Sequence, residues 1–270
     1  MENVPKLENH GVLKTWIYPD YQKIGQSRAV VLATPQTGKE ALAREALKAP
    51  GFWLKIARPR GLERGCIVAK SAEKAARESG VSVIVVPQFT DIKPVSENVD
   101  ITVFSQHLDP VKPGAFTGRI LAEAVKSAGA EGSLLNHSER RIGTVEINSC
   151  VERCNEADLY SLVCADTAEA GVNIARVKPD IIAVEPPDLI GTGISVSKAR
   201  PELITDSLQR IRVVNSAVKV LCGAGITTPE DVSKAIQLGT EGVLVASSVV
   251  KSKNPYSVLS DMANAIVNSK

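Results

Sequence analysis

From Gly51 onward, short apolar runs alternate with longer stretches in which apolar residues recur every three or four positions. Near-continuous apolar runs of four to six residues are typical of strands buried on both faces of a parallel sheet, and the longer periodic stretches are typical of amphipathic helices. Eight runs are expected to form strands: Phe52–Ile56, Val81–Val86, Ile101–Ser105, Gly132–Leu135, Tyr160–Cys164, Ile181–Glu185, Val218–Cys222 and Gly242–Val245. The helices expected between and after them include Leu62–Ser79, Thr167–Val177, Pro201–Val214, Pro229–Leu238 and Pro255–Asn268.

Eight strands that alternate with helices predict an α/β fold, a (β/α)₈ barrel over residues 51–270 with its helices outside. In such a barrel the active site lies at the carboxyl ends of the strands. Residues 1–50 lack this alternation, and we expect an N-terminal extension of unknown role.

Composition excludes several classes of protein. The 270 residues are 44% hydrophobic and 23% charged, which suits one globular core. The formal net charge of +2 and the absence of a basic run with aromatics argue against nucleic-acid binding, and no apolar run is long enough to cross a membrane. Five cysteines without paired spacing favour a reducing cytoplasm, and with only three scattered histidines they argue against a metal site.

The first candidate catalytic residue is His137, which follows the strand Gly132–Leu135 in the sequence Asn-His-Ser-Glu-Arg-Arg. Ser138 is a candidate N-cap for a helix that would begin directly behind it. The positive end of that helix would keep the imidazole of His137 neutral. A neutral ring still donates one N–H and is suited to polarising a carbonyl. A lone loop histidine more often has no such role, so this interpretation depends on its neighbours.

The second candidate is Glu185, an acid at the end of an apolar strand. Burial there would raise its pKa towards that of a useful base. Two prolines and a Gly-Thr-Gly turn follow, with Gly191 and Gly193 at the tip. The stretch is typical of a mobile lid that has a base at its root. A surface turn would explain the glycines but not the buried acid.

These two stretches closely resemble the triosephosphate isomerases, in particular those of archaeal type, and the resemblance extends over residues 61–270. It implies a TIM barrel that needs no cofactor or metal. In the family, the histidine that matches His137 is the electrophile and the glutamate that matches Glu185 is the proton-abstracting base. These two roles belong to the well-known chemistry of the family and come to this chain only through the resemblance.

Carried over from the family, five further positions would hold the substrate phosphate through backbone groups: Ile190, Gly191, Gly225, Ala246 and Ser247. The last three lie in the small-residue loops after the seventh and eighth strands, where such barrels usually bind phosphate. The segment Gly114–Gly118 resembles a family loop that packs against a neighbouring subunit, which implies a homo-oligomer, a dimer or tetramer. Glu139 is a candidate for positioning Lys55, and Arg140 and Arg141 for structural ion pairs.

The first strand departs from the family pattern. The family has Asn-x-Lys there, and ungapped matching of the following helix places Lys55 on the catalytic lysine and Trp53 on the asparagine. Residues i and i+2 of a strand face the same side, so Trp53 is expected to point inward beside Lys55. Its indole would replace a small hydrogen-bonding amide, overpack the strand or push Lys55 out of reach.

The favoured function is therefore the interconversion of glyceraldehyde 3-phosphate and dihydroxyacetone phosphate by Glu185, His137 and Lys55 in a cytoplasmic enzyme. One alternative is a catalytically impaired or silent phosphate-binding barrel, because of Trp53. The other is a different phosphate-handling barrel enzyme, such as a lyase or synthase, which would share the phosphate loops but need neither His137 nor Glu185.

Overall fold

The computed structural model describes residues 51–56, 62–186, 189 and 194–269, apart from the side chains of Phe52 and Leu62. The chain divides into two compact units, Met1–Gly38 and Lys39–Lys270, and every described residue belongs to the second unit.

The described strands form one eight-stranded parallel sheet in the order β2-β1-β8-β7-β6-β5-β4-β3. A parallel bridge between Val85 and Val103 connects the two edges of this order, so the sheet closes into a barrel. The strands are β1 (Gly51–Lys55), β2 (Ser82–Val86), β3 (Phe104–Ser105), β4 (Gly132–Leu135), β5 (Tyr160–Ala165), β6 (Ile181–Val184), β7 (Lys219–Cys222) and β8 (Gly242–Val245). All eight fall on the predicted runs, and the barrel prediction is confirmed.

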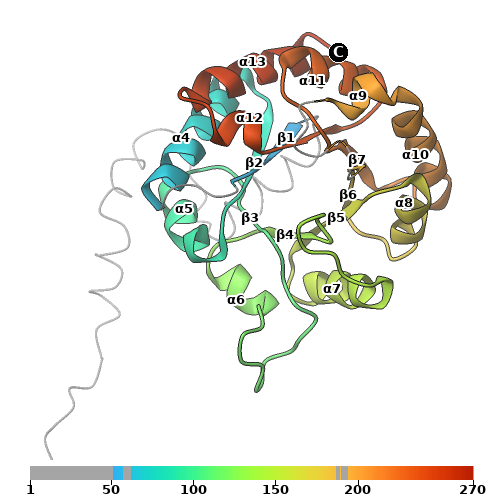
Figure 1. The fold of residues 1–270 in the computed structure, drawn as a ribbon. Coiled ribbons are helices and arrows are strands. Elements are labelled where there is room, and N and C mark those ends of the chain that lie inside the picture. The colour runs from blue at the N-terminus through green and yellow to red at the C-terminus, as the bar shows by residue number, and fades with distance from the viewer. Residues whose placement is uncertain (1–50, 57–61, 187–188, 190–193, 270) are drawn as a thin grey trace, which may run out of the picture. The chain divides into compact units, whose positions relative to one another are not determined.

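Helices surround the strands (Figure 1). They are α4 (Leu62–Ser79), η1 (Phe89–Asp91), α5 (Ile92–Asn98), α6 (Ala122–Ser127), α7 (Thr144–Glu156), α8 (Ala168–Ala175), α9 (Val196–Ala199), α10 (Pro201–Val214), α11 (Pro229–Gln237), α12 (Ser247–Val250) and α13 (Pro255–Val267). The predicted helices Leu62–Ser79 and Pro201–Val214 have the observed bounds, and the other three end within two residues of the prediction. None of the described helices is long and apolar enough to cross a membrane.

Two hydrophobic clusters fill the barrel unit. The larger joins the outward faces of the strands to the helices, as expected for a parallel sheet covered on the outside. The smaller fills the interior of the barrel with residues from every described strand, including Trp53, Phe104 and Leu244. Trp53 therefore points inward, as its register with Lys55 predicts.

Candidate active site

Lys55, His137 and Glu185 meet at the carboxyl ends of β1, β4 and β6. The Lys55 ammonium lies 3.2 Å from His137 Nε2 and 3.4 Å from His137 Nδ1. His137 Nε2 lies 3.9 Å from Glu185 Oε2. The three residues are far apart in the chain, and the barrel brings their side chains into one cluster.

The environment of His137 favours a neutral ring. Burial and, as the next cause, the positive charge of Lys55 together lower its pKa to about 4, against the opposing effect of Glu139. The backbone N–H of Glu139 donates to Nδ1 at 3.1 Å, so Nδ1 is an acceptor. In a neutral imidazole the other nitrogen then carries the proton, and Nε2–H is the group turned towards Glu185.

Ser138 does not cap a helix, and this prediction is wrong. Residues 138–139 form a turn in which the backbone N–H of Arg140 donates to the carbonyl of His137. Helix α7 begins six residues later, at Thr144, after Gly143 as its N-cap. The neutral state of His137 therefore comes from burial and Lys55, and not from the positive end of a helix.

Glu185 is more deeply buried than the sequence indicates, with 3% of its surface exposed. Burial raises its pKa to about 7, although a hydrogen bond from the Cys164 thiol and the charge of Lys55 act in the opposite direction. Among the described residues, its Oε2 has no hydrogen-bond partner. A Cβ on Gly223 would lie 2.5 Å from Glu185 Cγ, so only glycine fits behind this carboxylate.

Trp53 leaves Lys55 in place. A Cβ on Gly242 would lie 2.8 Å from Cζ3 of the indole, and Gly242 is the first residue of β8. Trp53 itself pairs with Leu244, two residues further along that strand. The indole thus leans towards the starting ends of the strands, away from the end where Lys55 lies. The expectation that it would push Lys55 out of reach is wrong.

Charged neighbours hold the lysine and the histidine loop. Lys55 donates to Glu139 at 2.7 Å, as the proposed positioning by Glu139 requires. Arg140 pairs with the buried Asp109 at 3.1 Å, and Arg141 lies 3.5 Å from Asp166.

The loop after β7 is packed tightly against the chain that follows the expected lid. Gly225 has φ +70°, and a Cβ there would lie 1.9 Å from the carbonyl oxygen of Ile194. The backbone N–H of Val196 donates to the carbonyl of Ala224 at 3.1 Å. Glycine at 225 is therefore required both by its backbone angle and by this close approach.

The other expected phosphate ligands are described only in part. Ala246 is the N-cap of α12 and makes no side-chain cap bond, and Ser247 is the first residue of that helix. Ile190 and Gly191 lie outside the described residues.

Three residues that shape the site were not predicted from the sequence: Asn136, Cys164 and Gly223. Asn136 is an asparagine directly after a strand, where the chain turns into a loop. Asparagine tolerates a left-handed backbone, so its position could have indicated the positive φ that the structure shows. Gly223 and Cys164 act through contacts with Glu185 that no local pattern reveals.

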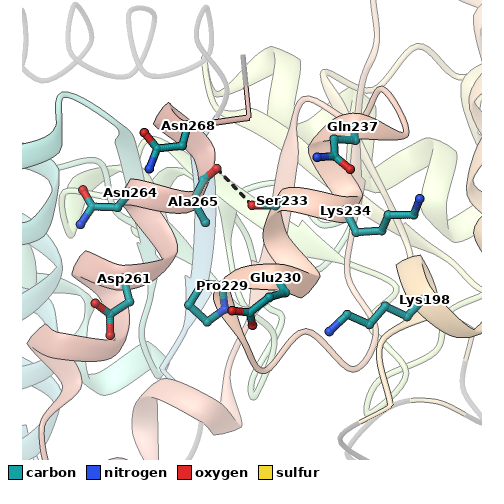
Figure 2. A pocket seen from close by; sticks show the side chains of 10 residues that line it. All are labelled: Lys198, Pro229, Glu230, Ser233, Lys234, Gln237, Asp261, Asn264, Ala265 and Asn268. Carbon is teal, nitrogen blue, oxygen red and sulfur yellow. Dashed lines mark hydrogen bonds between the residues drawn. The ribbon is translucent and has the colours of Figure 1, made fainter.

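Outside the barrel mouth, a hollow of about 640 Å³ borders α11 and α13. Figure 2 shows its lining, which includes Lys198, Glu230, Lys234 and Asp261. None of the predicted site residues lines it. In the described part of the chain no three His, Cys, Asp or Glu side chains are grouped to hold a metal ion, and Cys150 and Cys154 are buried in α7.

Known proteins are similar to this chain over most of its length. A model of the triosephosphate isomerase family matches residues 60–266. The triosephosphate isomerase of Methanocaldococcus jannaschii is 47% identical over 203 residues, covering 75% of this chain and 93% of its own. That of Methanothermus fervidus is 43% identical over 235 residues, covering 87% and 97%. That of Methanoculleus marisnigri is 47% identical over 199 residues, covering 74% and 90%. The chain belongs to the triosephosphate isomerase family.

Proposed function

We propose that this protein interconverts D-glyceraldehyde 3-phosphate and dihydroxyacetone phosphate through an enediolate, the reaction for which its family is named. The reaction moves a proton between adjacent carbons and leaves the oxidation state of the whole molecule unchanged. It therefore needs general acid–base groups and charge stabilisation, and neither a redox cofactor nor a metal.

Glu185 is the proposed base that takes the proton alpha to the substrate carbonyl. A carboxylate with a pKa of about 7 is basic enough to accept this proton and is still substantially ionised at neutral pH. Its unpartnered Oε2 is the oxygen available for this step.

His137 and Lys55 are the proposed partners of the developing oxyanion. The neutral ring of His137 offers Nε2–H, and Lys55 supplies a positive charge within 3.4 Å of that ring. Charge that develops in a site shielded from water is stabilised strongly by donors already held in place. The single observation that best supports these roles is the approach of a buried carboxylate with a raised pKa to a neutral histidine, 3.9 Å away.

The substrate phosphate is proposed to bind backbone groups of Ile190, Gly191, Gly225, Ala246 and Ser247, with Lys55 as a further cation. Support comes from the position of the last three residues after β7 and β8 and from family membership. The segment 186–193 is proposed to act as the lid that excludes water during the reaction.

Kinetics of Glu185 variants test the proposal. Glu185→Asp withdraws the carboxylate by about one methylene, and a displacement of about 1 Å can lower the rate ~10²-fold. Glu185→Gln removes the base altogether and is expected to lower kcat further, with binding of a phosphorylated analogue retained. If both variants keep the turnover of the parent, Glu185 is not the base.

The pH profile provides a second test of the same role. The base must be ionised, so kcat/KM of the parent is expected to fall as the pH drops through about 7. His137 stays neutral down to about pH 4, so its protonation should not change kcat/KM above that pH. A profile that is flat from well below to well above pH 7 would contradict the assignment.

The alternative of a silent barrel rests on Trp53. The comparisons give it no support, and Lys55 keeps its contacts with His137 and Glu139. A coupled assay of the parent decides the question, and turnover at the efficiency usual for such enzymes excludes impairment. A lyase or synthase would not need the Glu185–His137 pair, and substrate analogues of those reactions are expected to give no thermal stabilisation.

A homo-oligomer, a dimer or tetramer, in the cytoplasm is part of the proposal. Phe116 lies in the segment after β3 that resembles the family's contact loop, and 49% of its surface is exposed. Phe116→Asp would place a charge in an apolar contact and is expected to lower the mass measured by light scattering at a given protein concentration. Val145→Asp on α7 is the control, since that valine is also exposed but lies outside the loop. An unchanged mass for Phe116→Asp would exclude this loop as the contact.

A further inference from the structure

Asn136, the residue before His137, has a backbone conformation that few side chains tolerate. Its φ is +55°, and its surface is only 7% exposed. Two other non-glycine residues of the described chain have a positive φ, Asp158 and Lys178, and both are exposed. Asn136 is thus the one buried member of this group, and asparagine is among the residues that adopt this conformation most readily.

The side chain of Asn136 bridges the histidine loop to the next strand. Its Oδ1 accepts from the backbone N–H of Ile142 at 3.1 Å, which closes the loop of residues 136–142. Its Nδ2 donates to the carbonyl of Cys164 in β5 at 2.9 Å. The Arg141 guanidinium also donates to the backbone carbonyl of Asn136 at 3.4 Å.

This bridge connects the two halves of the site. Cys164 hydrogen-bonds Glu185 through its thiol and Asn136 through its carbonyl. The loop that Asn136 closes contains His137 and Glu139, whose backbone N–H sets the acceptor nitrogen of the ring. One side chain therefore fixes the loop of His137 relative to the strand that contacts Glu185.

We propose that Asn136 is a positioning residue of the isomerase, which sets the orientation of His137 through its left-handed backbone and its two side-chain hydrogen bonds. The inference rests on the proposed role of His137. Nothing in the geometry places Asn136 against the substrate, and it acts through the neighbouring imidazole.

Asn136→Gly keeps the left-handed backbone and removes both side-chain bonds. We expect kcat to fall ~10-fold, because released loop residues let the imidazole move, and displacements near 1 Å cost up to ~10²-fold. Asn136→Ala also strains the backbone and should lower kcat further, towards ~10²-fold. KM should change less than about threefold in both variants, since neither removes a group that binds the substrate in its ground state.

Lys178→Ala is the matched control. It places alanine at φ +54° in the exposed turn that follows α8, without a bridge to any proposed catalytic residue. Its kcat should equal that of the parent. Should Asn136→Ala fail to fold, Asn136→Gly tests the proposal by itself, because glycine tolerates the backbone angle.

A second readout needs no turnover. The ¹⁵N shifts of the His137 ring, assigned with His137→Gln, should show the proton on Nε2 in the parent and a mixture of tautomers in Asn136→Gly. If the parent did not isomerise the triose phosphates, the proposed function would fail while these shifts still tested the positioning. Asn136→Gly with the kcat of the parent, a loss confined to KM, or unchanged ring shifts would overturn the inference.

Discussion

Glu185 is only 3% exposed, and its ionised form has lost most of the water that a surface carboxylate keeps. This loss raises its pKa from 4.5 to about 7. The folded protein therefore binds a proton at Glu185 more tightly than the unfolded chain does. The contribution of Glu185 to the free energy of unfolding has its full value below about pH 4.5, and it is lost as the pH rises through about 7.

We expect Glu185→Gln to be more stable than the parent at about pH 8, above both pKa values. Each pH unit between the two pKa values corresponds to about 1.4 kcal/mol, so the gain is on the order of 3 kcal/mol. The difference should vanish near pH 4.5, where the folded parent carries the proton. Urea unfolding of both proteins at several pH values measures it.

Glu169→Gln on α8 is the control for this prediction, because Glu169 is exposed. Its charge lies in the first turn of α8, so removing it should lower the free energy of unfolding by less than about 1 kcal/mol at about pH 8, the opposite sign to the gain expected for Glu185→Gln. Equal stability of Glu185→Gln and parent at the alkaline end would mean that the carboxylate is better solvated than its burial indicates.

For single residues, the sequence predicted which candidate side chains meet but not how they are held. His137 and Glu185 were predictable because both follow buried strands, and strand ends meet at one edge of a barrel. The inward direction of Trp53 was predictable too, but the end of the barrel towards which its indole leans was not, because the room it uses comes from Gly242 on the last strand. The left-handed backbone of Asn136 depends on bonds to Ile142 and Cys164 that form only after folding.

Among the helices, the long amphipathic ones were predicted well and the short ones were not. The four-residue helices α9 and α12 contain about one turn each, too little for a periodic pattern to appear. The helix expected after Ser138 begins late for a physical reason. The N–H groups of Arg140 and Ile142 are already bonded to His137 and Asn136, so helical hydrogen bonding starts only beyond them.

Helix α11 starts with a reciprocal capping box between Thr228 and Asp231. Asp231 Oδ2 accepts from the backbone N–H groups of Thr227 and Thr228, and its Oδ1 pairs with Lys198 at 2.7 Å. Figure 2 shows Lys198 beside the first turn of this helix. Burial tends to raise the pKa of Asp231, but these bonds outweigh it and hold the pKa below 3.8.

Asp231→Ala should therefore destabilise the fold by about 2–4 kcal/mol, because it leaves two backbone N–H groups and Lys198 without their acceptor. This decrease in the free energy of unfolding should have its full size above about pH 4. It should become smaller as the pH falls through the lowered pKa of Asp231 in the folded state. Thr167→Ala, which removes the simple N-cap bond to Ala170 of α8, should cost only about 1 kcal/mol. Urea unfolding at neutral and acidic pH compares them, and equal losses in the two variants would contradict this account.

Closure of the barrel depends on contacts between the two ends of the described unit. β1 pairs with both β2 and β8, and the backbone N–H of Gly51 donates to the carbonyl of Glu241 at 3.2 Å. Outside the sheet, α4 packs on α13, where the Lys74 ammonium lies 4.1 Å from the ring centre of Tyr256. Residues 51–270 thus contain all the described strands of the closed barrel and the helices that join its ends.

We predict that a chain of residues 51–270 folds without the first fifty residues. Its far-UV circular dichroism should show the helix and strand content of the full protein, and its thermal unfolding should remain cooperative. Retention of kcat would show in addition that the extension takes no part in the site.

A second truncation, beginning at Leu62, sharpens the test because it removes β1 as well. That chain loses Lys55, Trp53 and both ladders of β1, and it exposes the edges of β2 and β8 together with the rest of the interior cluster. It should fail to fold or should aggregate, since open edges of a parallel sheet are templates for association. If both truncations fail alike, residues 1–50 contribute to the core. If both fold alike, closure by β1 is not needed for stability, and the barrel does not hold together in the way described.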